Sequence, residues 1–397
     1  MSKRILLLDT GKEWGGGTNS MFELLKRIDR TRFDITALFY RNYPKGSASD
    51  LRSELARIGI PLELQPPGKQ PWWAKLAKEL VRGLWRRSPE ARQQRLLAIE
   101  TRWRILPAAR QLAAHLRAGQ FDLLYMNNQP SSNLEGYLAA EMAGIRVVQH
   151  CRIEVRLSPF EAAIVNRTAH KILCVSQGVR QSLIESGVSP ELCTVVYNAI
   201  DGKQALPPPV GLPKSGTDTL VIGSIGSLIK RKANDHLLRA AAQLRQRCGI
   251  PFLIVLVGEG PEQASLEALA GELGLAEQVL FAGFQQMPLA WAAAMDIVVL
   301  ASAKEGLPRV LLEAMLLGKA AIASDVVGSQ ELVVHGESGF LYRYGDEASL
   351  AAHLQTLLEQ PVLRQQFGAA GRQRVVQNFS IERYVSDVEK HLESALQ

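Results

Sequence analysis

Short apolar segments alternate with helical patterns along almost the whole chain, and this alternation limits the folds that the chain can adopt. The first apolar segment, RILLLDT (4–10), is followed by a glycine-rich turn and the helical pattern MFELLKRI (21–28). FDLLYMN (121–127), RVVQHC (146–151) and KILCVSQ (171–177) resemble further strands that end in polar residues. Strands that alternate with helices in this way predict α/β domains built on parallel sheets.

The same order of strands and helices starts again after a segment rich in proline and glycine. ELCTVVYNAIDG (191–202) closes the first series, and KQALPPPVGLPKSGTDT (203–219) is too rich in proline and glycine to hold regular structure. The strand TLVIGSIGSL (219–228) opens a second series, followed by a helical pattern over 233–248 and a strand over 252–260.

A chain of 397 residues is too long for one typical domain and suits two domains of about 200 residues each. We expect one Rossmann-like domain over 1–202 and a second over 203–378. The remaining residues, 379–397, predict a helix that crosses back to the first domain. Ligands of such sheets bind at the carboxyl ends of the strands, so a cleft between the two sheets is the expected site.

The composition argues against several classes of protein. The hydrophobic share of 47% and the charged share of 21% are typical of soluble globular chains. The apolar run near the N-terminus is too short for a signal-peptide core, and no apolar run is long enough to cross a bilayer, so we expect a cytoplasmic protein. The four cysteines form no CxxC pair, which disfavours a zinc knuckle or a disulfide framework.

One basic segment, residues 68–118, holds twelve cations and three acids, a charge of +9 against +7 for the whole chain. It also holds four of the six tryptophans. A basic helix with interleaved aromatics suits an anionic membrane surface. A solvated face with its tryptophans in the core, a calmodulin-like partner and nucleic acid remain alternatives. The residues are Lys69, Lys75, Lys78, Arg82, Arg86, Arg87, Arg92, Arg95, Arg102, Arg104, Arg110 and Arg117, Glu79, Glu90 and Glu100, and Trp72, Trp73, Trp85 and Trp103.

The motif EGLPRVLLEAM (305–315) sets two carboxylates around a predicted helix start. Pro308 suits the first turn of a helix, and Gly318 suits its end. Glu305 then precedes the helix, while Glu313 lies about one and a half turns into it, on the order of 10 Å away by helical rise. An ordinary helix with an acidic N-terminal flank is the alternative interpretation.

The start of this predicted helix favours an anion. The exposed amides of Gly306, Leu307, Arg309 and Val310 would point outward there, where the helix dipole adds about half a positive charge. A nucleotide-diphosphate sugar has a matching shape, because its sugar and ribose hydroxyls flank an anionic diphosphate. Carboxylates accept hydrogen bonds from such hydroxyls, and amides hold the phosphates.

The loop GSLIKRKAND (226–235) follows the first strand of the second series. It would place Ser227, Lys230, Arg231 and Lys232 at the carboxyl end of that strand, where consecutive cations suit a diphosphate leaving group. A basic surface loop is the alternative. VGEGPEQ (257–263) does not complete a dinucleotide fingerprint, because glutamine replaces its third glycine.

Several further residues are candidates for the same ligand. Glu259 lies between two glycines at a strand end, and Gly283 leaves room for a base to approach the backbone. Gly16 and Gly17, at a helix start in the first half, permit close approach of a phosphate. His150 ends a strand, although an isolated histidine is often structural. No HExxH, DxD or histidine cluster supports a metal site, so we expect none.

Taken together, these motifs make the second half resemble the GT-B retaining glycosyltransferases of family GT4. The resemblance runs through the glycine-rich and basic loops above, VSQGV, VVYNAIDG and DIVVLASAKEGLPRVLLEAMLLGKAAIASDVVGSQELVVHGESGFLY, in register over most of 171–342. It implies an α/β GT-B fold with an acceptor-binding first domain and a donor-binding second domain. It also implies that Glu305 addresses the donor sugar, Glu313 the ribose and Lys232 the phosphates, and that His150 is the donor-side histidine.

Two differences from the family pattern concern the phosphate contacts. Ser227 and Ala233 stand where the family usually has arginine and glycine, so Lys230 or Arg231 would supply the missing cation. The glycine-rich loop carries Asn19 where a glutamate is frequent. Nothing family-wide is recognisable over 50–119, where acceptor specificity is expected to vary.

The resulting hypothesis is a retaining, metal-independent transferase that moves a sugar from a UDP or GDP type donor to a hydroxyl of a lipid-linked or saccharide acceptor. We expect a role in cell-envelope polysaccharide or lipopolysaccharide synthesis, peripheral contact of 68–118 with the inner face of the plasma membrane, and no nucleic-acid partner or cofactor. The alternatives are a sugar-nucleotide binding module without transfer activity and a sugar-nucleotide epimerase of the same fold.

Overall fold

The computed structural model describes residues 2–11, 13–46, 48–66, 68, 70–86, 88–214 and 216–397. Lys69 and Arg87 of the basic segment lie outside the described residues, as does the side chain of Glu90.

The first half of the chain forms a parallel sheet of seven strands in the order β5-β2-β1-β6-β7-β8-β9. β1 pairs in parallel with β2 on one side and with β6 on the other. A short antiparallel pair, β3 and β4, lies apart from it. The strands are β1 Lys3–Asp9, β2 Phe33–Phe39, β3 Pro44–Lys45, β4 Ser49–Asp50, β5 Leu62–Leu64, β6 Leu123–Met126, β7 Arg146–Cys151, β8 Lys171–Cys174 and β9 Cys193–Val195.

Helices connect consecutive strands of this sheet, as parallel pairing requires. They are α1 Gly16–Leu25, α2 Leu51–Arg57, α3 Trp72–Leu84, α4 Pro89–Glu100, the π-helical turn η1 Thr101–Ile105, α5 Leu106–Ala118, α6 Leu134–Ala143, α7 Pro159–Thr168 and α8 Gln177–Glu185. Two 3₁₀ turns, η2 Pro130–Ser132 and η3 Pro190–Leu192, precede α6 and β9.

The second half forms a parallel sheet of six strands in the order β12-β11-β10-β13-β14-β15. The strands are β10 Leu220–Ile225, β11 Phe252–Val257, β12 Val279–Gly283, β13 Ile297–Leu300, β14 Ala320–Ser324 and β15 Phe340–Tyr342. The helices are η4 Lys230–Lys232, α9 Asn234–Arg247, α10 Gln263–Glu272, η5 Ala276–Gln278, α11 Pro288–Ala293, α12 Arg309–Leu316, α13 Ser329–Leu332, α14 Glu347–Glu359, α15 Pro361–Asn378 and α16 Ile381–Leu396.

The central strands of both sheets are apolar runs because helices cover both of their faces. Ile5, Leu6, Leu7 and Leu8 of β1 are fully buried, and every residue of β11 is buried. The expected architecture of two parallel α/β sheets in tandem is therefore confirmed.

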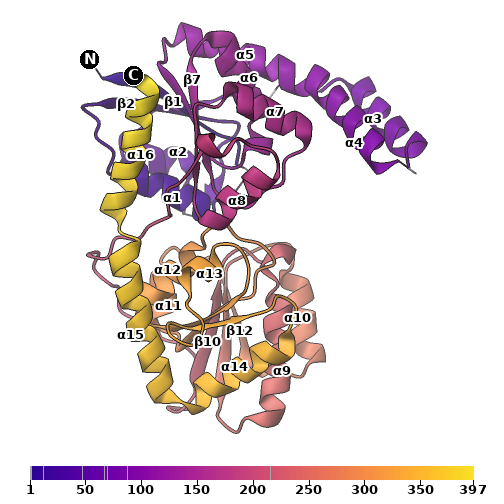
Figure 1. Ribbon diagram of the computed structural model, residues 1–397. Helices are drawn as coiled ribbons and strands as arrows, with labels where there is room; N and C mark the ends of the chain where they lie inside the picture. The colour runs from indigo at the N-terminus through magenta and orange to yellow at the C-terminus, as the bar shows by residue number, and fades with distance from the viewer. Residues whose placement is uncertain are drawn as a thin grey trace.

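The last two helices run along both halves of the molecule (Figure 1). α15 packs against α12 and β14 of the second half, and α16 packs against β7 and α1 of the first. Ile381, Tyr384, Val388 and Leu392 belong to the apolar core of the first sheet. α16 therefore completes the first half of the fold.

α3 and α4 project from the body of the first half as a helical arm (Figure 1). The arm contains most of the basic segment. The chain passes from α4 through η1 into α5, so α5 roots the arm beside α6. Edge-on contact between Trp73 and Trp103, at 4.3 Å between ring centroids, and an ion pair of Lys78 with Glu100 at 3.3 Å join α3 to the α4–η1 segment. Among the described residues, no helix is both long and apolar enough to span a bilayer.

Candidate functional site

The loops that follow β10, β11, β12 and β13 meet at one edge of the second sheet. This is the edge at which open parallel sheets bind their ligands. The candidate residues of the second half lie on these loops, at the end of β12 and on α12. In the first half, Gly16 and Gly17 begin α1 and His150 lies in β7.

The most charged feature of this edge is a buried cluster around Glu305. Its Oε1 accepts a hydrogen bond from Lys232 Nζ at 2.7 Å and lies 3.3 Å from Arg231 Nη1. Lys232 and Arg231 form the turn η4, and Arg231 also donates to the carbonyl of Lys304 at 2.7 Å. The sequence placed these three residues on two loops about seventy positions apart, and the structure brings them into contact.

Electrostatics keep Glu305 ionised. Its side chain is only 10% exposed, and burial alone would raise the pKa of the carboxyl. The charges of Lys232 and Arg231 outweigh burial and hold the pKa below its usual value. One carboxylate balances only one of the two cations, so the cluster keeps a net positive charge, and an incoming anion would also compete with Glu305 for its partners.

The helix after Glu305 begins one residue later than the sequence predicts. α12 starts at Arg309, and Pro308 occupies the N-cap with an extended backbone (ψ 115°). The proline side chain has no oxygen to accept a hydrogen bond, so it leaves the amides of the first turn free of a side-chain cap. Gly318, with φ +68°, follows the last turn as expected.

Glu313 lies on α12 in an environment unlike that of Glu305. Its side chain is 17% exposed and lies 3.4 Å from Nη2 of Arg309 on the same helix. Burial raises the pKa of Glu313, and the charge of Arg309 only partly opposes this effect. The two acids of the motif are therefore tuned in opposite directions by their surroundings.

Glycines allow the neighbouring strand ends to approach each other closely. Gly258, after β11, has φ +138°, and a methyl group there would lie 2.0 Å from the carbonyl oxygen of Gly226 after β10. Gly258 also donates to the carbonyl of Gly283 at 2.8 Å. Glu259 Oε1 accepts from the amide of Phe284 at 3.3 Å. Glu259 and Gly283 thus lie together, next to the loop that carries Ser227.

Across the junction, the glycine-rich loop of the first half begins α1. Gly15 is the N-cap, and the space around added methyl groups on Gly15 and Gly16 is open. A methyl on Gly17 would lie 3.6 Å from Cγ of Arg152. Asn19 accepts from the indole of Trp14 at 2.8 Å, so it orders this loop.

Arg152 is a residue of this junction that sequence reasoning missed. It is 8% exposed and donates to Asn127 at 2.7 Å, to Asn198 at 3.0 Å and to the hydroxyl of Tyr384 at 3.1 Å. All three acceptors are neutral, so this nearly buried cation has no directly bonded carboxylate among the described residues. Its position just beyond the end of β7 is the signal that could have identified it.

His150 does not reach the junction. Its side chain is fully buried, and Nδ1 lies 2.7 Å from the hydroxyl of Tyr125. Burial and the nearby charge of Arg152 hold the pKa of His150 well below its usual value. The end of the strand explains the difference, because His150 is still in β7 and packs near Tyr384 of α16, whereas Arg152 follows the last strand residue, Cys151, and no longer obeys the alternation of the strand.

Backbone contacts bring the two halves together around Glu305. The amide of Glu154 donates to the carbonyl of Glu305 at 3.4 Å, and Asn198 donates to the carbonyl of Leu307 at 2.9 Å. A methyl on Gly306 would lie 2.1 Å from the carbonyl oxygen of Arg152. The loop 305–307 is therefore enclosed between the two halves of the molecule.

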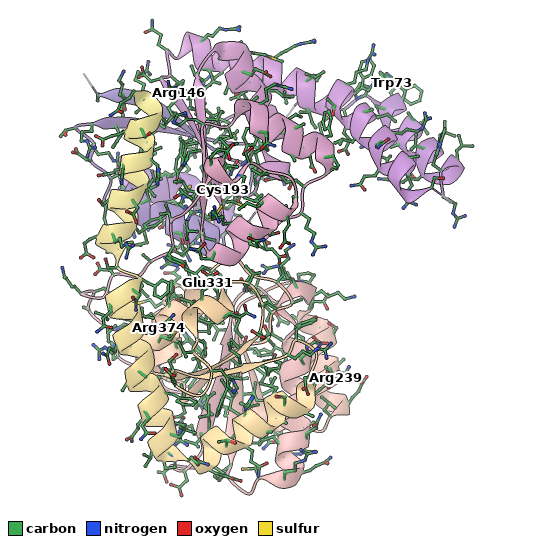
Figure 2. All side chains as sticks on the ribbon, viewed as in Figure 1. Trp73, Arg146, Cys193, Arg239, Glu331 and Arg374 are labelled. Carbon is green, nitrogen blue, oxygen red and sulfur yellow. The ribbon has the colours of Figure 1, made fainter. Side chains whose placement is uncertain are left out.

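Glu331 makes a second contact between the halves (Figure 2). Its carboxylate accepts from the amides of Gln177 and Gly178 at 2.8 and 2.9 Å, at the start of α8. Acids favour the positive end of a helix dipole, so Glu331 holds α8 against α13. Over the described residues, the structure gathers no group of three or more side chains suited to hold a metal ion.

Comparison with known proteins identifies this arrangement. Residues 213–374 match the family described as glycosyl transferases group 1, and residues 14–204 match glycosyltransferase family 4. Between them the two matches cover most of the chain. The chain belongs to glycosyltransferase family 4. The family resemblance of the sequence motifs is thereby confirmed.

Two curated relatives within this family act in glycan synthesis by name. The chain is 29% identical over 54% of its length to the lipopolysaccharide core biosynthesis glycosyltransferase LpsD of Rhizobium meliloti. It is 32% identical over 53% of its length to an N-acetylgalactosaminyltransferase of Campylobacter jejuni whose name specifies a diphospho-undecaprenol substrate. The matches span 61% and 57% of these relatives, so the chain matches about three fifths of their length.

A solved structure confirms the GT-B fold of this family member. The HepE protein of Anabaena, in complex with UDP, superposes with a TM-score of 0.75 over 98% of this chain and 100% of that chain, at 24% identity. At this identity the likeness establishes the fold, and the chemistry must come from the residues of this chain.

Proposed function

We propose that this chain is a retaining, metal-independent glycosyltransferase. It moves a sugar from a UDP or GDP type donor to a hydroxyl of a lipid-linked or saccharide acceptor. The observation that carries the proposal is the ionised Glu305, which lies between the cations of η4 and the start of α12. The names of the relatives LpsD and HepE in complex with UDP support a UDP-sugar donor and a role in cell-envelope glycan synthesis.

In this proposal, donor binding exchanges partners within the cluster. The diphosphate takes the charges of Lys232 and Arg231 and accepts from the amides of Gly306, Leu307, Arg309 and Val310 at the start of α12. Glu305 then turns to the hydroxyls of the sugar. Arg231, which already reaches Glu305, supplies the cation that Ser227 lacks.

The other donor contacts follow from position. Glu313 accepts hydrogen bonds from the ribose hydroxyls, one and a half turns along α12. Glu259 and Gly283, at the ends of β11 and β12, lie where the base stacks against the backbone. Gly16 and Gly17 face the diphosphate from α1.

The same arrangement supports chemistry without a protein nucleophile. The sugar passes through an oxocarbenium-like state, the acceptor hydroxyl attacks from the face that the diphosphate leaves, and the departing phosphate oxygen takes the hydroxyl proton. Lys232 and Arg231 stabilise the charge that develops on the diphosphate. Arg152 adds a third cation from the first half, and His150 acts as a positioning residue through Tyr125 beneath the strand end.

The test is a screen of purified protein against a panel of sugar nucleotides, with release of nucleoside diphosphate as the readout. The proposal expects slow donor hydrolysis with one or a few donors, without added metal. Protection against thermal unfolding by a sugar nucleotide with no turnover would favour the binding module. Formation of a free sugar isomer would favour the epimerase.

We also propose that the basic segment places the protein on an anionic membrane surface, at the inner face of the plasma membrane. The arm supports this because Trp72 and Leu84 are 72% and 73% exposed while its cations lie beside them. The alternative of a solvated face requires the tryptophans to lie in the core, whereas Trp72 is exposed. The relative that acts on a diphospho-undecaprenol substrate is consistent with such a location.

A further inference from the structure

A cavity of about 850 Å³ lies outside the donor site, where the arm joins the body. Residues of α4, η1, α5 and the start of α7 line it. Leu97, Ala98, Trp103, Leu106 and Phe160 make much of its wall apolar. Phe160 is 43% exposed, so the cavity wall includes an aromatic ring that a ligand can reach from solvent.

The exposed apolar face of α3 is continuous with this cavity. Trp72, Leu76, Leu80 and Leu84 recur every four residues, so they lie along one side of the helix, and they are between 55% and 73% exposed. The ring of Trp73 on α3 contacts Trp103 in the cavity wall. The contact of Trp73 with Trp103 therefore joins α3 to the cavity wall.

The cavity is basic as well as apolar. Arg102 and Arg110 line it, and none of its lining residues is acidic. Neither arginine has an ion-pair partner among the residues that the structure describes, although Arg102 lies 5.1 Å from the ring centre of Trp103. An apolar cavity with two unpaired guanidinium groups is complementary to an amphiphile with an anionic head.

The cavity also lies within reach of the proposed reaction centre. The amide of Glu154 contacts the carbonyl of Glu305, and the chain then runs through six residues to Phe160 in the cavity wall. Six residues span at most about 20 Å. Phe160 in the cavity wall therefore lies no more than about 20 Å from the segment that contacts the loop of Glu305.

We propose that this cavity binds the hydrocarbon chain of a lipid-linked acceptor whose head is a phosphate or diphosphate. Arg102 and Arg110 hold the anionic head, the apolar wall holds the adjoining part of the chain, and the face of α3 lies in the membrane interface from which the lipid enters. This inference rests on the proposed function and specifies its acceptor as a lipid rather than a free saccharide.

The probe for the test is farnesyl phosphate below its micelle concentration, titrated calorimetrically into the whole protein. Ala98→Trp places a large ring in the cavity from an exposed position of α4, so the fold should survive. Gln93→Trp adds the same ring at an exposed position of α4 that does not line the cavity. We expect Ala98→Trp to weaken binding at least tenfold and Gln93→Trp to leave it unchanged.

Two further ligands separate the contributions of chain and charge. Farnesol and inorganic phosphate should each bind at least tenfold more weakly than farnesyl phosphate. Phe160→Ser, on α7, is a second variant that should weaken farnesyl phosphate binding. Equal affinity in the wild type and in Ala98→Trp, or farnesol binding as tightly as its phosphate, would overturn the inference.

Binding of UDP to the same samples distinguishes the two proposals. UDP contacts the edge of the second sheet, so Ala98→Trp should leave its affinity unchanged. If UDP binds and farnesyl phosphate does not, the lipid site is wrong and the transferase proposal stands. If no nucleoside diphosphate binds at all, the proposed function fails first.

Discussion

At the scale of single residues, the two carboxyl groups of one motif have different surroundings, which shift their pKa values in opposite directions. Glu305 contacts two cations, which hold its pKa low despite burial. Glu313 has one partially compensating cation, so burial dominates and its pKa is raised. Perturbed pKa values cluster at functional sites, so the opposite shifts of these two acids support a functional role for the motif.

The first prediction concerns the buried cluster. Glu305→Ala and Lys232→Ala should each lower turnover by about a hundredfold or more, the usual scale for loss of a preorganised charge contact. Arg247→Ala is the control and should leave turnover unchanged, because Arg247 is exposed in the last turn of α9, at the end of that helix away from the loop after β10. Turnover should be measured with the donor that the panel identifies. Near-normal rates in both Glu305→Ala and Lys232→Ala would contradict the assignment.

The second prediction concerns pH. A carboxylate accepts hydrogen bonds from ribose hydroxyls better than a protonated carboxyl does, so UDP affinity should fall as Glu313 gains its proton. Because the pKa of Glu313 is raised, this fall should begin above pH 4.5, while Glu305 is still ionised. Calorimetric titrations of UDP from pH 7 downwards test it. The Glu313→Gln variant should bind UDP weakly, with no further fall in affinity over that range. If the affinity of the wild-type protein for UDP stays unchanged down to pH 4.5, Glu313 does not contact the ribose.

At this scale, the sequence predicted which residue types belong to the site better than it predicted where their side chains point. The spacing of Glu305 and Glu313 and the run of cations in η4 were visible in one dimension. The direction in which a side chain points at the end of a strand was not visible in the sequence, because it depends on the residue at which the strand stops pairing with its neighbours. The role predicted for His150 stays a prediction: its side chain is fully buried, whereas Arg152, two positions on, lies at the junction.

At the scale of elements, the site is shaped by strand ends that only glycine can bring so close. Gly258→Ala should lower the free energy of unfolding by about 2 kcal/mol, because its φ of +138° is rare for other residues and its methyl would collide with a carbonyl. Gly249→Ala is the control, since it has an ordinary φ and open space around it. Thermal unfolding curves of both variants test this, and equal melting temperatures would contradict it.

The order of the elements was largely predictable, and their edges were not. Continuous apolar runs predicted β1, β6, β7 and β8 of the first sheet and β10 and β11 of the second. β2 and β5 escaped prediction because FDITALF interrupts its apolar residues with an aspartate and a threonine, and because β5 is an edge strand of only three residues. α12 begins after Pro308 rather than at it, a difference of one residue that local propensity does not determine.

At the scale of the whole molecule, the arm adds a basic and apolar surface that does not take part in the packing of either sheet. If this surface meets anionic lipid, the wild-type protein should sediment with phosphatidylglycerol vesicles at low salt and be released as salt rises, because the Debye length falls from about 10 Å at 0.1 M to about 3 Å at 1 M. Phosphatidylcholine vesicles are the control. Sedimentation that is the same with and without anionic lipid would contradict membrane contact.

The central claim is that two acids on α12 and the loop before it hold the ends of a sugar nucleotide whose diphosphate rests on backbone amides and on Lys232. A crystal structure of the chain soaked with UDP or GDP tests it most directly. The account predicts diphosphate density at the amides of 306–310, with the ribose hydroxyls within hydrogen-bond distance of Glu313. An empty α12 terminus with the nucleotide bound elsewhere would contradict the account.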